Sequence, residues 1–92
     1  MPPDFALSTH AQDMLNERRI SESWVWSTIT EPDDVWEGQD GNTHYAKVIV
    51  ERGSRVLHIV VNQNATPQRI VTAFFDRRLK KKEPGQPNET QN

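Results

Sequence analysis

Hydrophobic residues recur at helical spacing near the start of the chain. Between residues 7 and 21, three apolar side chains fall on one arc at 100° per residue: Ala11, Met14 and Leu15. This pattern predicts an amphipathic helix, with Ser8 or Thr9 suited to cap its first turn. A second predicted helix covers residues 22–30, because Ser21 can cap its start and Pro32 must end it.

The remainder of the chain favours strands. Alternating or apolar runs bounded by turn residues predict strands over residues 35–38, 43–52, 55–62 and 69–77, the first of them short. Asp40-Gly41 and Gly53-Ser54 are typical turn dipeptides between them. We therefore expect an α+β fold, in which two N-terminal helices pack on one face of a three- to four-stranded antiparallel sheet. The opposite face of that sheet would be partly open, and a site would most naturally lie there or at the edge between helices and sheet.

Length and composition limit the alternatives. The chain has 92 residues, so we expect a single α+β domain over residues 5–78 and a disordered, polar and basic tail over residues 79–92. There is no cysteine, which excludes disulfides and thiolate catalysis and favours a cytoplasmic protein. No apolar run approaches the roughly 18 residues of a membrane span, and no signal peptide is evident.

Charge is distributed unevenly along the chain. Through residue 51 there are three basic and ten acidic residues, a net charge of −7, whereas from residue 52 onward eight basic residues face three acidic ones, a net charge of +5. A basic second half suggests a surface that faces a polyanion, or equally a basic edge strand and tail that aid solubility. The candidate nucleic-acid contacts there are Arg69, Arg77, Arg78 and Lys80.

Two polar residues stand out on the first predicted helix. Arg18 falls in the middle of the apolar arc and His10 lies at its edge. A histidine can act as a general acid or base, and an arginine can hold a phosphate with its bidentate fork. The structural alternatives are a His10 bonded to water or backbone, and an Arg18 that covers carbonyls or pairs with an acid.

The predicted strands carry further candidates. Tyr45 and Lys47 share one strand face, where they could stack a base and hold a phosphate or simply form a solvated face. Thr72 lies on the last strand, and alternation does not say which face of that strand is core. His58 alternates with valines and suits a half-buried, hydrogen-bonded histidine. The three histidines match no compact metal-ligand motif, so we expect neither a metal site nor a cofactor.

The order of these pieces resembles a bacterial family known as domain of unknown function 4258. The resembling segments cover about residues 5–77: Leu7-Ser8-Thr9-His10-Ala11, Glu17-Arg18-Arg19-Ile20-Ser21, Glu31-Pro32, Tyr45-Ala46-Lys47, Val56–Val61 and Ile70-Val71-Thr72-Ala73-Phe74. One departure is Arg19, where the family carries a glycine. Arginine disfavours the left-handed conformation that such a glycine adopts, so we expect this helix to end differently.

The family looks related to the RelE/barnase-like ribonuclease fold, which is rich in toxins. The resemblance implies RNA as a partner, an antitoxin-like protein as another, and metal-independent cleavage in which a 2′-hydroxyl attacks the adjacent phosphorus. It places His10, Arg18, Lys47 and Thr72 at the scissile phosphate. The alternative is a non-catalytic interaction module that uses Trp26, Trp36 and a sheet edge, with Arg18 structural.

Overall fold

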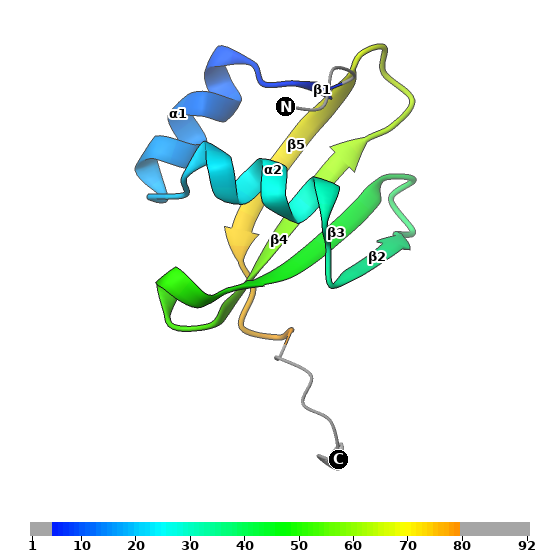
Figure 1. Ribbon diagram of the computed structural model, residues 1–92. Helices are drawn as coiled ribbons and strands as arrows, with labels where there is room; N and C mark the ends of the chain where they lie inside the picture. The colour runs from blue at the N-terminus through cyan, green and yellow to red at the C-terminus, as the bar shows by residue number, and fades with distance from the viewer. Residues whose placement is uncertain (1–4, 80–92) are drawn as a thin grey trace.

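Two helices lie across one face of a twisted sheet (Figure 1). The computed structural model describes residues 5–79. Its elements in chain order are β1 (Phe5–Ala6), α1 (Thr9–Glu17), α2 (Glu22–Thr30), β2 (Asp34–Glu37), β3 (Thr43–Ile49), the 3-10 turn η1 (Val50–Arg52), β4 (Arg55–Asn62) and β5 (Gln68–Phe75). The predicted α+β class, with both helices on one face, is confirmed. The predicted tail lies almost wholly outside the described residues.

The sheet has the spatial order β1-β5-β4-β3-β2. The strands β2 to β5 form the expected antiparallel meander, with Tyr45 opposite Ile59 and Ile59 opposite Ala73. The short strand β1 adds a parallel pairing to the first two residues of β5. The sequence did not predict β1, because two residues are too few to show a period.

Strand β3 ends earlier than predicted. We expected a strand over residues 43–52, but the chain leaves the sheet after Ile49 and makes a 3-10 turn. Gly53 and Ser54 then both adopt positive φ, at 70° and 61°, as a tight hairpin turn requires. The turn starts earlier because the Gly53 and Ser54 amides donate to the Val50 and Ile49 carbonyls.

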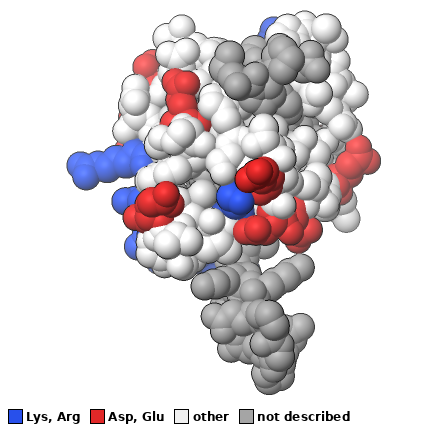
Figure 2. All heavy atoms as spheres, viewed as in Figure 1, with Lys and Arg blue, Asp and Glu red and all other residues white. Residues whose placement is uncertain are grey.

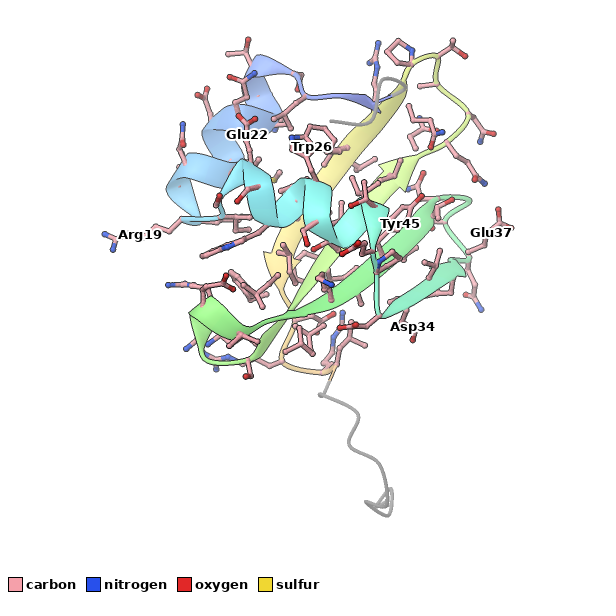
Figure 3. All side chains as sticks on the ribbon, viewed as in Figure 1. Arg19, Glu22, Trp26, Asp34, Glu37 and Tyr45 are labelled. Atoms are coloured by element: carbon pink, nitrogen blue, oxygen red, sulfur yellow. The ribbon has the colours of Figure 1, made fainter. Side chains whose placement is uncertain are left out.

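Helix α1 ends in a Schellman motif. The Ile20 amide donates to the Leu15 carbonyl at 2.8 Å and the Arg19 amide to the Asn16 carbonyl at 3.2 Å. Ile20 and Leu15 are both buried, which supplies the apolar contact of the motif. Arg19 has a φ of 57°, so our expectation of a different helix end is wrong. The buried Ile20 holds Arg19 in the conformation that glycine prefers, and the Arg19 side chain projects into solvent (Figure 3).

The hydrophobic core fills the space between the helices and the sheet. From α1, α2 and the loop between them it takes Ala11, Met14, Leu15, Ile20, Val25 and Ile29, and from the sheet Ile49, Leu57, Ile59, Val61, Ile70 and Ala73. Trp26, which the interaction-module alternative assigns to a partner surface, packs partly buried against this core. No helix among residues 5–79 is long and apolar enough to cross a membrane.

Among residues 5–79, no helix covers the second face of the sheet, which we call the open face (Figure 1). Residues on this open face alternate with the core residues of β4, and three of those from β4 are nevertheless buried: Val56, His58 and Val60. His58 is 6 % exposed, because rings from the neighbouring strands pack against its imidazole. The open face is therefore a polar and aromatic layer rather than a bare solvated surface.

Candidate functional site: a histidine pair on the open face

The structure brings two of the four predicted catalytic residues together. Arg18 Nη1 donates to Thr72 Oγ1 at 3.2 Å and to the Ala73 carbonyl at 2.8 Å. His10 is exposed in the first turn of α1, about 12 Å from Arg18 along the helix axis by residue count. Arg18 itself is exposed at the C-cap rather than facing the core. The catalytic roles of these residues stay predictions.

The contacts of Arg18 tie the end of α1 to the sheet. Within the described part of the chain, strand β1 pairs with β5 only at Gln68 and Arg69, and no described strand pairs with the outer side of β5 at Ala73. The Arg18 guanidinium donates to the Ala73 carbonyl on this unpaired stretch. A charged side chain at a sheet edge also discourages pairing with another chain.

Tyr45 and Lys47 lie on the helix-covered face. Tyr45 is partly buried against the core and lies near the C-terminal end of α2 in Figure 3. Lys47 Nζ donates to the Glu31 carbonyl at 2.8 Å, and Glu31 is the C-cap of α2. This bond satisfies one of the carbonyls that a helix end leaves without a partner. The strand face that could have been an exposed Tyr–Lys platform is therefore partly buried under a helix.

The predicted nucleic-acid contacts fall at the two ends of β5. Arg69 is exposed at its start, beside β1, and Arg77 and Arg78 are exposed just past its end. Lys80 lies outside the described residues. Figure 2 shows the helix-covered face, where acidic side chains are spread widely and basic ones are few. This face is a poor surface for a polyanion.

On the open face, two histidines contact each other directly. His44 comes from β3 and His58 from β4, and His44 Nδ1 lies 2.7 Å from His58 Nε2. His44 Nε2 lies 3.2 Å from Asp40 Oδ1, and His58 Nδ1 lies 3.0 Å from Asp76 Oδ2. The two imidazoles thus form a continuous chain between two carboxylates, and we call these four residues the histidine network.

The number of protons in this network follows from its geometry. An ionised carboxylate only accepts, so each outer contact needs a hydrogen on the histidine nitrogen. The central nitrogen–nitrogen contact needs one more hydrogen, because two lone pairs repel at 2.7 Å. Two neutral imidazoles carry one ring N–H each. All three contacts are hydrogen bonds together only when the pair holds one additional proton, shared between the two rings.

The inner end of the network is anchored by Arg78. Its Nε donates to Asp76 Oδ1 at 3.0 Å, its Nη2 to Asp76 Oδ2 at 3.0 Å, and its backbone amide to Asp76 Oδ1 at 2.9 Å. The hydrogen bonds from Arg78 hold the pKa of the buried Asp76 carboxyl well below its usual range. Asp76 therefore stays a charged acceptor beside His58 at neutral pH.

The outer end of the network is open to solvent. Asp40 lies in the turn between β2 and β3 and its side chain is 47 % exposed. The Asn42 backbone amide, followed by the His44 ring, lowers the pKa of Asp40. Gly38 makes this arrangement possible, since a Cβ there would come within 2.6 Å of Asp40 Oδ1 and would also collide with the His44 ring. The His44 side chain is only 14 % exposed, and its Nε2 faces Asp40 at this end.

Two aromatic side chains flank the histidines. The Trp36 ring, from β2, stacks on His44 with centroids 5.3 Å apart and also contacts His58 at 5.2 Å. Phe74, from β5, contacts His58 at 4.9 Å. All four rings lie on the open face, so four neighbouring strands contribute to one aromatic and titratable surface.

Sequence reasoning missed this site, although a signal for it was present. His44 and His58 occupy the same face of one predicted hairpin, and His58 pairs with Ala46, which places His44 on the adjacent diagonal. Asp76 is diagonal to His58 in the same way, because His58 pairs with Phe74. Because each histidine was considered separately, the hydrogen-bonded chain that connects them across the strands was not predicted.

Comparison with known proteins identifies the family and nothing finer. The model of one family, Domain of unknown function (DUF4258), matches residues 7–75, most of the chain. The protein belongs to the DUF4258 family. The family match spans both helices, the strands β2 to β5 and the two histidines, but stops just before Asp76. No curated protein and no solved structure matches the chain.

Proposed function

We propose that this DUF4258 protein is a metal-independent ribonuclease whose catalytic centre is the His44–His58 pair. The observation that carries the proposal is the direct 2.7 Å contact between the two imidazoles, held between two carboxylates on a sheet face that no described helix covers. Positioned histidines are the most common groups for proton transfer at neutral pH. Cleavage of RNA at a 2′-hydroxyl needs this kind of proton transfer.

The network supplies a base at its solvent-facing end. In the form with two ring hydrogens, His44 Nδ1 donates to His58 Nε2 and His58 Nδ1 donates to Asp76. His44 Nε2 then presents a lone pair, which requires the exposed Asp40 carboxylate to turn away from it and make room for the substrate. A 2′-hydroxyl at this nitrogen gives up its proton as its oxygen attacks the phosphorus. The P–O2′ bond forms, the P–O5′ bond breaks, and water protonates the leaving 5′-oxygen. The products carry a 2′,3′-cyclic phosphate and a 5′-hydroxyl.

The second histidine stabilises the charge that this step creates. When His44 gains a proton at Nε2, the hydrogen between the rings can move to His58 Nε2, so that the positive charge passes to His58. Asp76 lies 3.0 Å from His58 Nδ1 and offsets that charge. This arrangement repeats the logic of a carboxylate that orients and stabilises a catalytic imidazolium.

The surroundings of the pair suit single-stranded RNA. Trp36 and Phe74 provide aromatic surface beside the histidines, and bases stack on such rings without strong sequence preference. Arg78 donates to Asp76 through Nε and Nη2, which leaves guanidinium hydrogens for a phosphate. Its side chain is 80 % exposed and can reach a bound strand.

The proposal is tested by cleavage of short RNA in the presence of a chelator. Wild-type protein should cut the RNA and leave cyclic phosphate ends, and it should not cut a strand with 2′-deoxyribose at the scissile position. His44→Asn should lower the rate at least about 100-fold, as loss of a general base does. His10→Asn is the matched control and should cut normally.

The opposite result would favour the other catalytic placement. Loss of cleavage in His10→Asn, with His44→Asn fully active, would move the centre to His10, Arg18, Lys47 and Thr72. Intact RNA with every folded variant and with wild type would contradict a ribonuclease altogether.

A second candidate function is a protein-interaction module, which a partner such as an antitoxin-like protein would recognise. The edge strand β2 favours it, because Val35 is 47 % exposed there and one side of β2 pairs with no strand among the described residues. A partner strand could add to this edge. The discriminating observation is RNA cleavage, which this module would not perform.

A further inference from the structure

A hollow lies at the end of the sheet, between the turn that precedes β4 and the residues that follow β5. Its volume is about 220 Å³, and its polar lining comes from Ser54, Arg55, Asp76 and Arg77. Phe75 and Leu79 line it as well. Sites for drug-sized ligands span roughly 300–1,000 Å³, so this hollow suits one small group rather than a whole nucleotide.

The two arginines that line the hollow are exposed and uncommitted. Among residues 5–79, neither the Arg55 nor the Arg77 side chain makes a hydrogen bond or an ion pair. The neighbouring Arg78 differs, because it is held by two side-chain hydrogen bonds to Asp76. Two unpaired guanidinium groups around one small hollow are a natural site for an anion with several oxygen acceptors.

The carboxylate in the hollow does not cancel this positive charge. Asp76 already accepts hydrogen bonds from Arg78 and from the His58 ring, and Arg78 is its full counter-charge. The remaining charge of the lining is that of Arg55 and Arg77. The hollow is therefore net positive, although the whole chain has a net charge of −2.

The position of the hollow connects it to the histidine network. Asp76 is one of the residues that line the hollow, and its Oδ2 also contacts His58 Nδ1. The network runs from Asp40 in the β2–β3 turn to this carboxylate, so the hollow adjoins its inner end. An extended strand that places its scissile phosphate at His44 would pass over the open face towards this hollow.

We propose that the hollow binds a backbone phosphate of single-stranded RNA, at the Asp76 end of the histidine network and away from the phosphate that is cleaved at His44. Arg55 and Arg77 hold the phosphate oxygens, and the Ser54 hydroxyl donates a further bond. This inference rests on the proposed function for its position relative to the cleaved bond. The hollow gives the enzyme a subsite that fixes the position of the RNA strand on the open face without contacting a base.

The test measures RNA binding apart from cleavage. The probe is a short single-stranded RNA with 2′-O-methyl groups, which cannot be cut, bound to the full chain at several salt concentrations. The double variant Arg55→Gln/Arg77→Gln should bind at least about tenfold more weakly at low salt. The slope of log affinity against log salt should become shallower by about 0.7 for each phosphate that the variant no longer neutralises.

Arg19→Gln is the matched control for the two single variants Arg55→Gln and Arg77→Gln, because it removes the same charge from an exposed residue that does not line the hollow. This control should change the affinity and the slope much less than either single variant does. Melting temperatures should agree among the three single variants, since all three arginines are exposed. An equal loss of affinity in all three would overturn the subsite and indicate general charge attraction.

A second arm separates the source of the phosphate. Inorganic phosphate should shift the backbone amide NMR signals of Ser54 and Arg55 in wild type and not in the Arg55→Gln/Arg77→Gln variant. Such shifts combined with unchanged RNA affinity in that variant would overturn the RNA assignment, because the hollow would then hold only a free phosphate.

The outcome for the subsite is distinguishable from that for catalysis. If the protein cleaves RNA, the Arg55→Gln/Arg77→Gln variant should raise KM at least about fivefold and change kcat less than about twofold. If wild type binds the uncleavable RNA through Arg55 and Arg77 but never cuts a cleavable one, the subsite stands and the proposed ribonuclease fails.

Discussion

The two faces of the sheet use polar side chains in different ways. On the helix-covered face, Arg18 and Lys47 each donate to a backbone carbonyl and tie the end of one element to another. On the open face, His44 and His58 contact each other and two carboxylates in one connected chain. Single hydrogen bonds to backbone carbonyls stabilise the ends of helices and strands. A connected chain of titratable groups can in addition transfer a proton.

The largest expected effect is a difference in RNA cleavage between a variant on the open face and a variant on the helix-covered face. His58→Asn should lower RNA cleavage at least about 100-fold, because it removes the group that receives the positive charge. Arg18→Ala should keep the rate within about threefold. Both are measured under single-turnover conditions after circular dichroism has confirmed the fold, and His44→Gln replaces His58→Asn if the latter does not fold. Equal losses for the two variants would erase the functional contrast between the faces.

The next effect concerns the anchor of the network. Asp76→Asn should lower the free energy of unfolding at pH 7 by about 2 kcal/mol, since it weakens charge-assisted bonds to Arg78 and His58 in a buried position. Urea unfolding measures this loss. Asp13→Asn, an exposed acid on α1, is the control and should change stability by less than about 0.5 kcal/mol.

The same residue gives a pH dependence with a definite sign. Arg78 depresses the pKa of Asp76 in the folded protein, so its contribution is present at pH values above the unfolded pKa of about 4 and declines as the pH falls below it. The stability difference between wild type and Asp76→Asn should therefore shrink between about pH 5 and about pH 2. A difference that stays constant over this window would mean that Asp76 acts only through packing.

A smaller effect tests the space around the outer end. Gly38→Ala should cost about 1–3 kcal/mol, because the new methyl group collides with the His44 ring and Asp40. It should also disrupt the bond between these two side chains. Gln39→Ala, at the adjacent exposed position, should be nearly neutral in thermal unfolding. Similar melting temperatures for the two variants would show that the turn relaxes freely.

The hydrogen bonds of Arg18 and Lys47 to backbone carbonyls should each contribute modestly to the free energy of unfolding. Arg18→Ala and Lys47→Ala should each lower the unfolding free energy by about 1 kcal/mol, the typical value of one hydrogen bond. Neither group is fully buried, so the cost of burying an unpaired charge does not arise. A loss above about 3 kcal/mol for Arg18→Ala would contradict the exposed position that the structure gives it.

The smallest effect is a gain. Arg19→Gly should raise the unfolding free energy by about 1 kcal/mol, because glycine adopts the left-handed conformation of this position without the steric penalty that arginine carries. The matched change Arg69→Gly, in a strand, should instead be destabilising. Differential scanning calorimetry of the pair checks the opposite signs.

The fold was largely predictable because its elements have strong local signals. Ser8 and Ser21 cap the two helices as their positions suggest, and both glycine-containing turns fall where expected. The apolar arc of α1 is buried as predicted. The short strand β1 and the early end of β3 were not predictable, because they depend on pairing partners and on a turn that competes with the strand.

The candidate site was harder to predict, since proximity across strands decides it. Arg18 fell on the apolar arc by helical periodicity, yet the helix ends at Glu17 and Arg18 turns towards the edge of β5. Alternation placed Tyr45 and Lys47 on one face correctly but could not say which face the helices cover. The histidine network depends on the registers of two strand pairs, and these registers become visible only in the folded protein.

The central claim is that His44 and His58 share one proton between Asp40 and Asp76. Nitrogen-15 NMR of the histidine rings tests it most directly, by detecting coupling between His44 Nδ1 and His58 Nε2 across their hydrogen bond. We predict one hydrogen coupled to both nitrogens near neutral pH, and its loss in His58→Asn together with a shifted His44 signal. Two rings that titrate independently, with no coupling and a His44 signal indifferent to His58→Asn, would contradict the account.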